Sequence, residues 1–396
     1  MKFPGLFKVT FWKAVAVALM TAGAIAAVWR FSTGLGPSTN LVDTFPWGIW
    51  IGFDILVGVG LAAGGFTIAA TVYLFNIERF RPILRPTILT AFLGYLLVIA
   101  GLMVDLGRPW AIWHALIYWN PHSVMFEVAW CVMLYTTVLA LEFSPVVFER
   151  FNLERPLKII KAITIPLVVL GVILSTLHQS SLGSLFLIIP SRMHPLWYSE
   201  IIPFLFIISC VAAGLAMTIF ESFLSSRAFG REIEMPLLSE LARVIVVVLA
   251  LYFTVRVQDL ITRDALKFAF EINYQSILFA GELVLGVIVP FFLLLSKKIR
   301  EHRAGLFYSA VLVILGFIAH RINTAITSME QWPHRMYIPS WQELAVTAGL
   351  VAFGFVAFGF VAKYFHVFGH ESHHEPSTAK EEAKEEVEGL AVASTK

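Results

Sequence analysis

The chain of 396 residues has only two cysteines, and both Cys131 and Cys210 lie inside apolar segments. Iron–sulfur clusters are held by about four cysteine thiolates, so this chain alone has too few ligands for one. It also lacks the Cys-X-X-Cys-His motif that attaches haem covalently. If the protein moves electrons, the carriers must therefore belong to partner subunits or be diffusible molecules.

Charged residues are also scarce, at 14% against 58% hydrophobic residues, and the mean hydropathy is +0.79. A soluble domain carries about 25% charged residues, so the composition predicts an all-α membrane protein with many spans. The formal net charge is +2 and no basic stripe is present, which argues against nucleic-acid binding. The first apolar segment, 11–28, lacks a small-residue cleavage site and is expected to be a retained helix rather than a signal peptide.

Long apolar segments follow one another along most of the chain. Because about 20 apolar residues cross the hydrocarbon core as a helix, we predict about ten transmembrane helices. The expected spans are residues 11–31, 47–76, 86–106, 122–143, 157–178, 199–224, 237–257, 275–296, 305–322 and 341–366.

Lysine and arginine are divided unevenly between the two sets of connections that these spans create. The set that includes the N-terminus carries nearly twice as many as the other. Positive residues accumulate in cytoplasmic loops, so both termini are predicted to be cytoplasmic in the inner (cytoplasmic) membrane, with the connections after odd-numbered spans facing outward. The Lys- and Glu-rich tail, 367–396, is expected to be disordered and cytoplasmic.

Short motifs recur in the same order in the two halves of the chain. The Asn-X-X-Ser-X-X-Phe motif of 120–126 recurs at 273–279, and the Ala-Ala-Gly tripeptide of 62–64 recurs at 212–214. Each match is weak, because small residues are common at helix contacts, and chance similarity between apolar segments is the alternative. The shared order favours a duplicated four-helix unit. The predicted parts are an N-terminal flanking helix (1–33), a first four-helix bundle (34–198), a second four-helix bundle (199–335), a C-terminal flanking helix (336–366) and the tail (367–396).

Ionisable side chains lie in or at the ends of four consecutive spans, all in the predicted outer half: Asp54, Asp105, Glu127 and His178. Such groups are costly at membrane depth and are usually kept for a function. The alternative for Asp54 and Glu127 is a buried carboxyl bonded to a neighbouring helix. Asp105 and Arg108 are equally well explained as an i,i+3 ion pair at a helix end. His178 beside three carboxyls suits proton exchange, because imidazole titrates near neutral pH.

These groups suit the head group of a quinone, which needs donors for two carbonyl oxygens and takes up protons when it is reduced. Glu221 lies near the inner end of the sixth span. Two interpretations are equally open: it starts a proton route from the cytoplasm, or it is a charge at the membrane boundary whose side chain extends toward water. Glu282 has roughly the place of Glu127 in the second unit, but that unit has no clear partner for Asp54. We therefore place the site in the first unit.

Other functions remain as alternatives at this point. His178 and His320 end spans on the outer side and would ligate a b-type haem, but each is solitary, and His320 with Arg321 looks interfacial. A secondary transporter also uses repeats and buried carboxyls, although its repeats are more often inverted, whereas these units run parallel. A passive anchor explains the buried carboxyls poorly.

Several of these segments resemble the NrfD/PsrC superfamily of integral membrane subunits that interact with quinones. The resemblance is narrower for the HybB-type membrane subunit of respiratory nickel–iron (NiFe) hydrogenases. The motifs extend over nearly the whole chain up to about residue 366. They are Phe45-Pro46-Trp47-Gly48, Phe53-Asp54, Asp105-Leu106-Gly107-Arg108, Ser123-Val124-Met125-Phe126-Glu127, Glu142-Phe143-Ser144-Pro145, His178-Gln179-Ser180-Ser181 and His194-Pro195-Leu196-Trp197.

The resemblance implies ten helices in two related four-helix bundles, with a quinone (menaquinone or ubiquinone) as bound substrate and no haem or iron–sulfur cluster in this chain. It implies an extracytoplasmic ferredoxin-like iron–sulfur subunit and a catalytic subunit as partners, which would be a NiFe hydrogenase, a molybdopterin enzyme or a multihaem cytochrome. Glu127 and Glu221 match acidic residues that are candidates for proton movement. Asp105, Arg108 and His178 match positions that line the quinone region. With Asp54, they form the predicted site.

Overall fold

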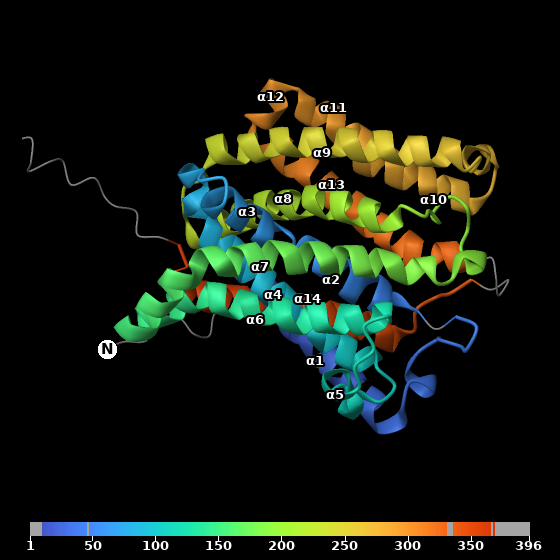
Figure 1. Cartoon of the computed structure of the whole chain (residues 1–396), viewed down its shortest axis with the longest axis horizontal. Helices are drawn as coiled ribbons and strands as arrows, with labels where there is room; N and C mark the ends of the chain where they lie inside the picture. Colours follow the sequence, from blue (N-terminus) through green and yellow to red (C-terminus); the bar gives the residue numbers. More distant parts are fainter. Residues whose placement is uncertain (1–9, 46, 331–335, 366, 369–396) are drawn as a thin grey trace, which may run out of the picture.

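The structure, a computed structural model, describes residues 10–45, 47–330, 336–365 and 367–368. Ten of its helical segments are long and apolar enough to cross a membrane. Figure 1 shows them lying side by side with their long axes roughly aligned. The predicted all-α fold with about ten spans is confirmed. All but two residues of the predicted tail lie outside the described residues.

The spans begin and end close to the predicted positions, and the fifth differs most. Its helix continues to Leu187, so His178 lies inside the span and does not end it. The ten spans are α1 (Phe11–Thr33), η2 with α2 and α3 (Trp50–Ile55, Leu56–Leu61 and Gly64–Tyr73), α4 (Arg81–Asp105), α6 (Val124–Arg150), α7 (Glu154–Leu187), α8 (Ile202–Phe229), α9 (Met235–Thr262), α10 with η7 and α11 (Tyr274–Leu283, Val284–Ile288 and Val289–Leu295), α13 (Arg303–Ala325) and α14 (Trp341–Tyr364).

Short helices occupy the connections. One end of the molecule contains the end of α4, the end of α7 and the starts of α6 and α10. We call it the outer end, because the distribution of lysine and arginine predicts that it faces outward. The short helices are η1 (Gly36–Ser38), η3 (Glu78–Phe80), η4 (Pro109–Ala111), α5 (His114–Ile117), η5 (Pro190–Arg192), η6 (Leu266–Phe270), α12 (Lys297–Arg300) and η8 (Thr327–Met329).

The spans pack as two closed rings of four. In the first ring α3, α4, α6 and α7 each contact the next, and α7 returns to α3. In the second ring α8, α9, α11 and α13 do the same, and α13 returns to α8. α1 packs on α14, which in turn packs on α4. The rings meet where α2, α3 and α7 contact α8. The exact domain boundaries and the duplication itself stay predictions.

Glycines let the two rings approach closely. A Cβ added to Gly214 of α8 would lie 2.3 Å from the backbone nitrogen of Gly64 in the second span. These glycines close the two Ala-Ala-Gly tripeptides, so the repeated motif of the sequence meets its own counterpart between the rings. Contact between equivalent residues is what a two-fold relation between the units produces. Small residues at such crossings allow backbone contact between membrane helices.

Two spans contain a π-helical segment. η2 includes Asp54, and η7 begins directly after the turn of α10 that carries Glu282. A π-helical turn inserts an extra residue into the helix and is frequent at functional sites. Each irregular segment therefore lies beside a buried carboxylate, one in each half of the molecule.

Candidate functional site

Asp54 is buried, with 8% of its surface exposed. The hydroxyl of Thr347 in α14 donates a hydrogen bond of 2.7 Å to its Oδ2 atom. On the other side α4 approaches closely at Gly101, where an added Cβ would lie 2.9 Å from the Asp54 Cβ. The glycine makes room for the carboxyl between helices. The neighbouring-helix partner that the sequence left open is therefore Thr347.

Asp105 and Arg108 do not form the ion pair that their spacing allowed, and none is present between them within the described residues. The reason is that α4 ends at Asp105 and the backbone of Arg108 is not helical (φ −130°, ψ 71°), so the helical i,i+3 geometry does not apply. Arg108 is exposed and Asp105 is half-buried. The cation at this helix end is instead Arg30 of α1. Its guanidinium donates to the carbonyl oxygens of Val104 (2.6 Å) and Leu106 (2.5 Å).

Glu127 lies in the first turn of α6, where a negative charge interacts favourably with the helix dipole. Its side chain is half-buried and forms no hydrogen bond or ion pair with any residue that the structure describes. Aromatic rings surround this turn, since Trp119, Phe126 and Trp130 lie with ring centroids 4.8–6.0 Å apart. Glu127 is thus an unpaired acid at an aromatic rim.

His178 is fully buried, and its Nδ1 atom is hydrogen-bonded to the hydroxyl of Tyr95 at 2.9 Å. Its Nε2 atom, the side-chain amide of Gln179 and the hydroxyl of Tyr135 have no hydrogen-bond partner in the described part of the chain. Buried polar atoms without partners commonly bond to a water or a ligand. Tyr95 lies about 15 Å inward from Asp105 at 1.5 Å per residue along α4. The predicted site therefore has two levels.

Glu221 lies apart from both levels, where α8 meets α3 and α4. It is buried beside Thr218, Thr90 and Gly64, and the gap among them has no room for a water molecule. Neither carboxylate oxygen has a hydrogen-bond partner among the residues of the described ranges. Asp54 and Asp105 both lie at the outer part of α4, because Asp54 contacts this helix at Gly101, one turn before Asp105. Glu221 is separate from both.

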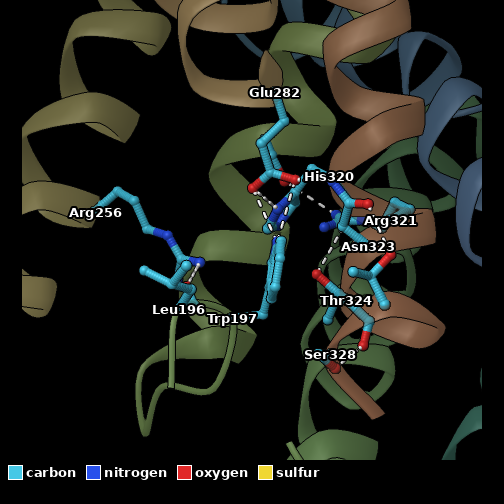
Figure 2. Close-up of polar contacts among 11 residues, drawn as sticks. Leu196, Trp197, Arg256, Glu282, His320, Arg321, Asn323, Thr324 and Ser328 are labelled. Carbon is cyan, nitrogen blue, oxygen red and sulfur yellow. Dashed lines mark hydrogen bonds and ion pairs between the residues drawn. The ribbon is translucent and has the colours of Figure 1, made fainter. Parts of the chain in front are cut away.

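A second buried cluster surrounds Glu282 in the second ring (Figure 2). The indole of Trp197 donates to both carboxylate oxygens, at 3.1 and 3.2 Å, and the Asn323 amide donates to one of them at 2.7 Å. The Nδ1 atom of His320 lies 3.4 Å from Oε1. Glu282 is therefore surrounded by donors, whereas Glu127 has no partner among the described residues, and the correspondence in position between the two stays a prediction.

Trp197 was expected only as part of a family motif, without a role at a site, and Asn323 was not expected at all. The available signal was the i,i+3 spacing of His320 and Asn323, which places both on one face of α13. His320 and Arg321, which the sequence suggested are interfacial, are buried inside the second ring, at 4% and 0% exposure. The guanidinium of Arg321 lies 3.5 Å from the ring centroid of Phe206, a cation–π contact that replaces water around the charge.

The loop before α8 holds Trp197 in place. Arg256 of α9 donates to the Leu196 carbonyl at 2.6 Å. The Leu196 amide donates in turn to Nδ1 of His194 at 3.2 Å. Burial lowers the pKa of His194 below its ordinary value, against the opposing charge of Glu271. The neutral ring is the form that accepts this hydrogen bond.

A cavity of about 30 Å³ adjoins Glu282, lined also by Tyr252, Arg256 and His320. This volume accommodates about two water molecules and is far too small for a haem. Within the described ranges, no group of three or more His, Cys, Asp or Glu side chains is arranged to hold a metal ion. The two candidate haem ligands, His178 and His320, belong to different rings, and each is hydrogen-bonded through Nδ1 to a neighbouring side chain, which leaves its Nε2 atom without a partner among the described residues.

Ten apolar helices, eight of them in two closed rings, with carboxyl groups buried between the helices, define a polytopic membrane protein. The chain belongs to the family described as polysulphide reductase NrfD, whose model matches residues 37–331. The resemblance seen in the sequence motifs is confirmed. The matched region ends before α14.

Individual relatives cover most of the chain. A protein of Nitratidesulfovibrio vulgaris is 40% identical over 84% of this chain and 88% of its own length. A protein of Escherichia coli named as a probable Ni/Fe-hydrogenase 2 b-type cytochrome subunit is 36% identical, with 82% and 84% covered. The integral membrane subunit of a menaquinone reductase of Nitratidesulfovibrio vulgaris is 27% identical, with 93% and 94% covered.

Proposed function

We propose that this protein is the quinone-reactive membrane subunit of a multisubunit respiratory oxidoreductase in the inner membrane, with both termini in the cytoplasm. Relatives named as a hydrogenase subunit and a menaquinone reductase subunit support this proposal. Because both cysteines are buried and unpaired, electrons would come from or pass to a partner at the outer end. A ferredoxin-like iron–sulfur subunit with its catalytic subunit suits that role.

The observation that carries the proposal is the gradient of exposure at the outer end of the first ring. Arg108 is exposed, Asp105 and Glu127 are half-buried, and Asp54 is buried. A ligand that is protonated when it is reduced needs an accessible polar site joined to buried proton-holding groups. This arrangement supplies both, next to aromatic rings that suit a planar head group.

The proposed roles of the side chains differ with their depth in the membrane. A bound quinone supplies chemistry that transfers two electrons and two protons. Arg108 donates hydrogen bonds at the rim, Glu127 exchanges a proton with water or ligand, and Asp54 holds a proton between helices. Tyr95 and Asp105 are about 15 Å apart along α4, so one head group cannot contact both levels. In this proposal His178 therefore exchanges protons at the deeper level, and Glu221 accepts protons from the cytoplasmic side.

Photoaffinity labelling of the intact complex with an azido-substituted menaquinone or ubiquinone tests the location of the site. We expect the label in peptides that contain residues 105–130, at the outer ends of α4 and α6. An excess of unmodified quinone should abolish this labelling. Specific labelling around Glu282 and His320 would move the quinone site to the second ring and overturn the proposal.

Glu127→Gln is expected to leave assembly intact, because this side chain is half-buried and has no partner to lose. Quinone-linked turnover should fall about 100-fold, the lower end of the effect of an acid–base group. Glu127→Asp should retain part of the activity. Turnover in proteoliposomes with the partner subunits present is the measurement, and wild-type rates in Glu127→Gln would remove this residue from the mechanism.

A further inference from the structure

α14 is docked against the π-helical segment η2 by two hydrogen bonds in register. The indole of Trp50 donates to the backbone carbonyl of Glu343 at 3.2 Å, and the hydroxyl of Thr347 donates to Asp54 at 2.7 Å. In each helix the two residues are four positions apart, so the bonds lie on matching faces. The NrfD family match ends at residue 331. A helix beyond the residues that the family model matches thus supplies the partner of Asp54.

Glu343 is the one acidic residue of α14 and is buried, with 0% exposure. Its carboxylate accepts hydrogen bonds from the backbone nitrogens of Ser340 (2.8 Å) and Asn40 (3.0 Å) and from the hydroxyl of Tyr337. Ser340 forms a capping box with Glu343, which by itself is an ordinary helix start. The donors from Asn40 and Tyr337 are additional and come from outside the helix. They hold the carboxylate at a fixed place near the outer end.

These acids form a series that leads outward. Asp54 packs against α4 at Gly101, one turn before Asp105, and Asp105 lies within electrostatic range of both Asp54 and Glu343, beside Arg30 at the end of α4. Tyr337, bonded to Glu343, lines a cavity of about 190 Å³ together with Asn40, Phe45 and Ile338. This volume accommodates several water molecules. Proton-holding groups therefore extend from the membrane interior to a cavity at the outer end that is large enough for water.

The geometry points to α14 as the helix that completes an outward proton path, from Asp54 past Asp105 and Glu343 to the cavity at Tyr337. Thr347 is the positioning residue of this path, because its hydroxyl fixes the Asp54 carboxyl. The inference rests on the proposed function for the source of the protons. Each step transfers one proton between neighbouring groups and leaves no bond other than O–H changed.

The surroundings of Asp54 make its protonation measurable in isolation. Asp105 of α4 is the charged group that acts on it, α14 presents the uncharged Thr347, and α13 presents apolar side chains to neighbouring Gly52. Infrared difference spectra of the full complex, recorded between two pH values, report the C=O band of a protonated carboxyl. The band that disappears in Asp54→Asn belongs to Asp54. This readout needs no quinone turnover.

Thr347→Val removes a donor from the charged form of Asp54, and a hydrogen bond to the charged form favours that form. We expect the midpoint of the Asp54 band to move to higher pH by about one unit, a tenfold change in proton dissociation. Thr347→Ser should restore the wild-type midpoint. Thr71→Val is the matched control, because the Thr71 hydroxyl bonds only to the Thr67 carbonyl of its own helix (2.7 Å).

An unchanged Asp54 band in Thr347→Val would overturn the role of α14. The second arm uses Tyr337→Phe, which removes the hydroxyl that bonds Glu343 but keeps the capping box. Proton release to the outer medium, followed with a pH dye in proteoliposomes, should slow several-fold in this variant, and an unchanged rate would contradict the path. If wild-type complex does not turn over quinone at all, the proposed function fails, while the infrared result for Thr347 still stands.

Discussion

Asp54→Asn is expected to reduce quinone-linked turnover about 1,000-fold, within the range for a positioned acid–base group. Its carboxyl is buried, bonded to Thr347 and seated against Gly101 of α4. Asparagine keeps the shape and still accepts the Thr347 hydrogen bond through its amide oxygen, but it cannot bind or release a proton. The fold is therefore preserved and the proton step is lost.

The measurement is quinone reduction or quinol oxidation by the reconstituted complex, with assembly checked by size-exclusion chromatography. Asp264→Asn is the control, because this acid is exposed and pairs with Lys267 on the surface. It should leave both assembly and turnover unchanged. An assembled Asp54→Asn complex with normal turnover would show that this carboxyl takes no part in proton transfer.

Glu282→Leu is expected to lower the stability of the second ring by about 3–5 kcal/mol, the range for removing one partner of a buried polar group. Leucine leaves the Trp197 indole, the Asn323 amide and His320 without their acceptor in a buried site. Each unsatisfied buried donor costs about 1–3 kcal/mol. The melting temperature of the purified complex should fall, and the yield of folded protein with it.

Glu282→Gln should be less harmful, because its amide oxygen still accepts one of these bonds. Glu301→Leu, at an exposed acid in the connection before α13, serves as the control and should not change the melting temperature. A stable Glu282→Leu variant that has lost turnover would contradict the structural role. It would make the Glu282 cluster part of the chemistry.

The sequence predicted the fold well and the site only in part. The hydropathy that identifies a span is summed over about 20 residues. One misjudged residue therefore shifts the predicted end of a helix but does not remove the helix. The fifth span shows the limit of this method: its hydropathy falls at His178, yet α7 continues to Leu187, because buried polar residues such as Gln179 remain helical inside the ring. His178 therefore lies deeper than its sequence position indicated.

Partners of individual side chains were less predictable. The Asp105–Arg108 spacing suits a pair only while the helix continues, and α4 ends between them. Arg30 reaches the same helix end from α1, a contact that no local pattern encodes. His320 and Arg321 looked interfacial because charges near a span end usually are, whereas Phe206 of α8 covers the guanidinium.

By itself, the sequence determined the membrane environment, the number of spans and the residue types available for chemistry, because these follow from composition and local periodicity, and its motifs indicated the family. Only the tertiary structure decided that Thr347 donates a hydrogen bond to Asp54 and that Trp197 and Asn323 donate to Glu282. It also decided that Glu127 has no partner among the residues that the structure describes. The physical reason is that such pairings depend on the depth and rotation of each helix. Those are set by close contacts such as Gly64 on Gly214, between segments far apart in the chain.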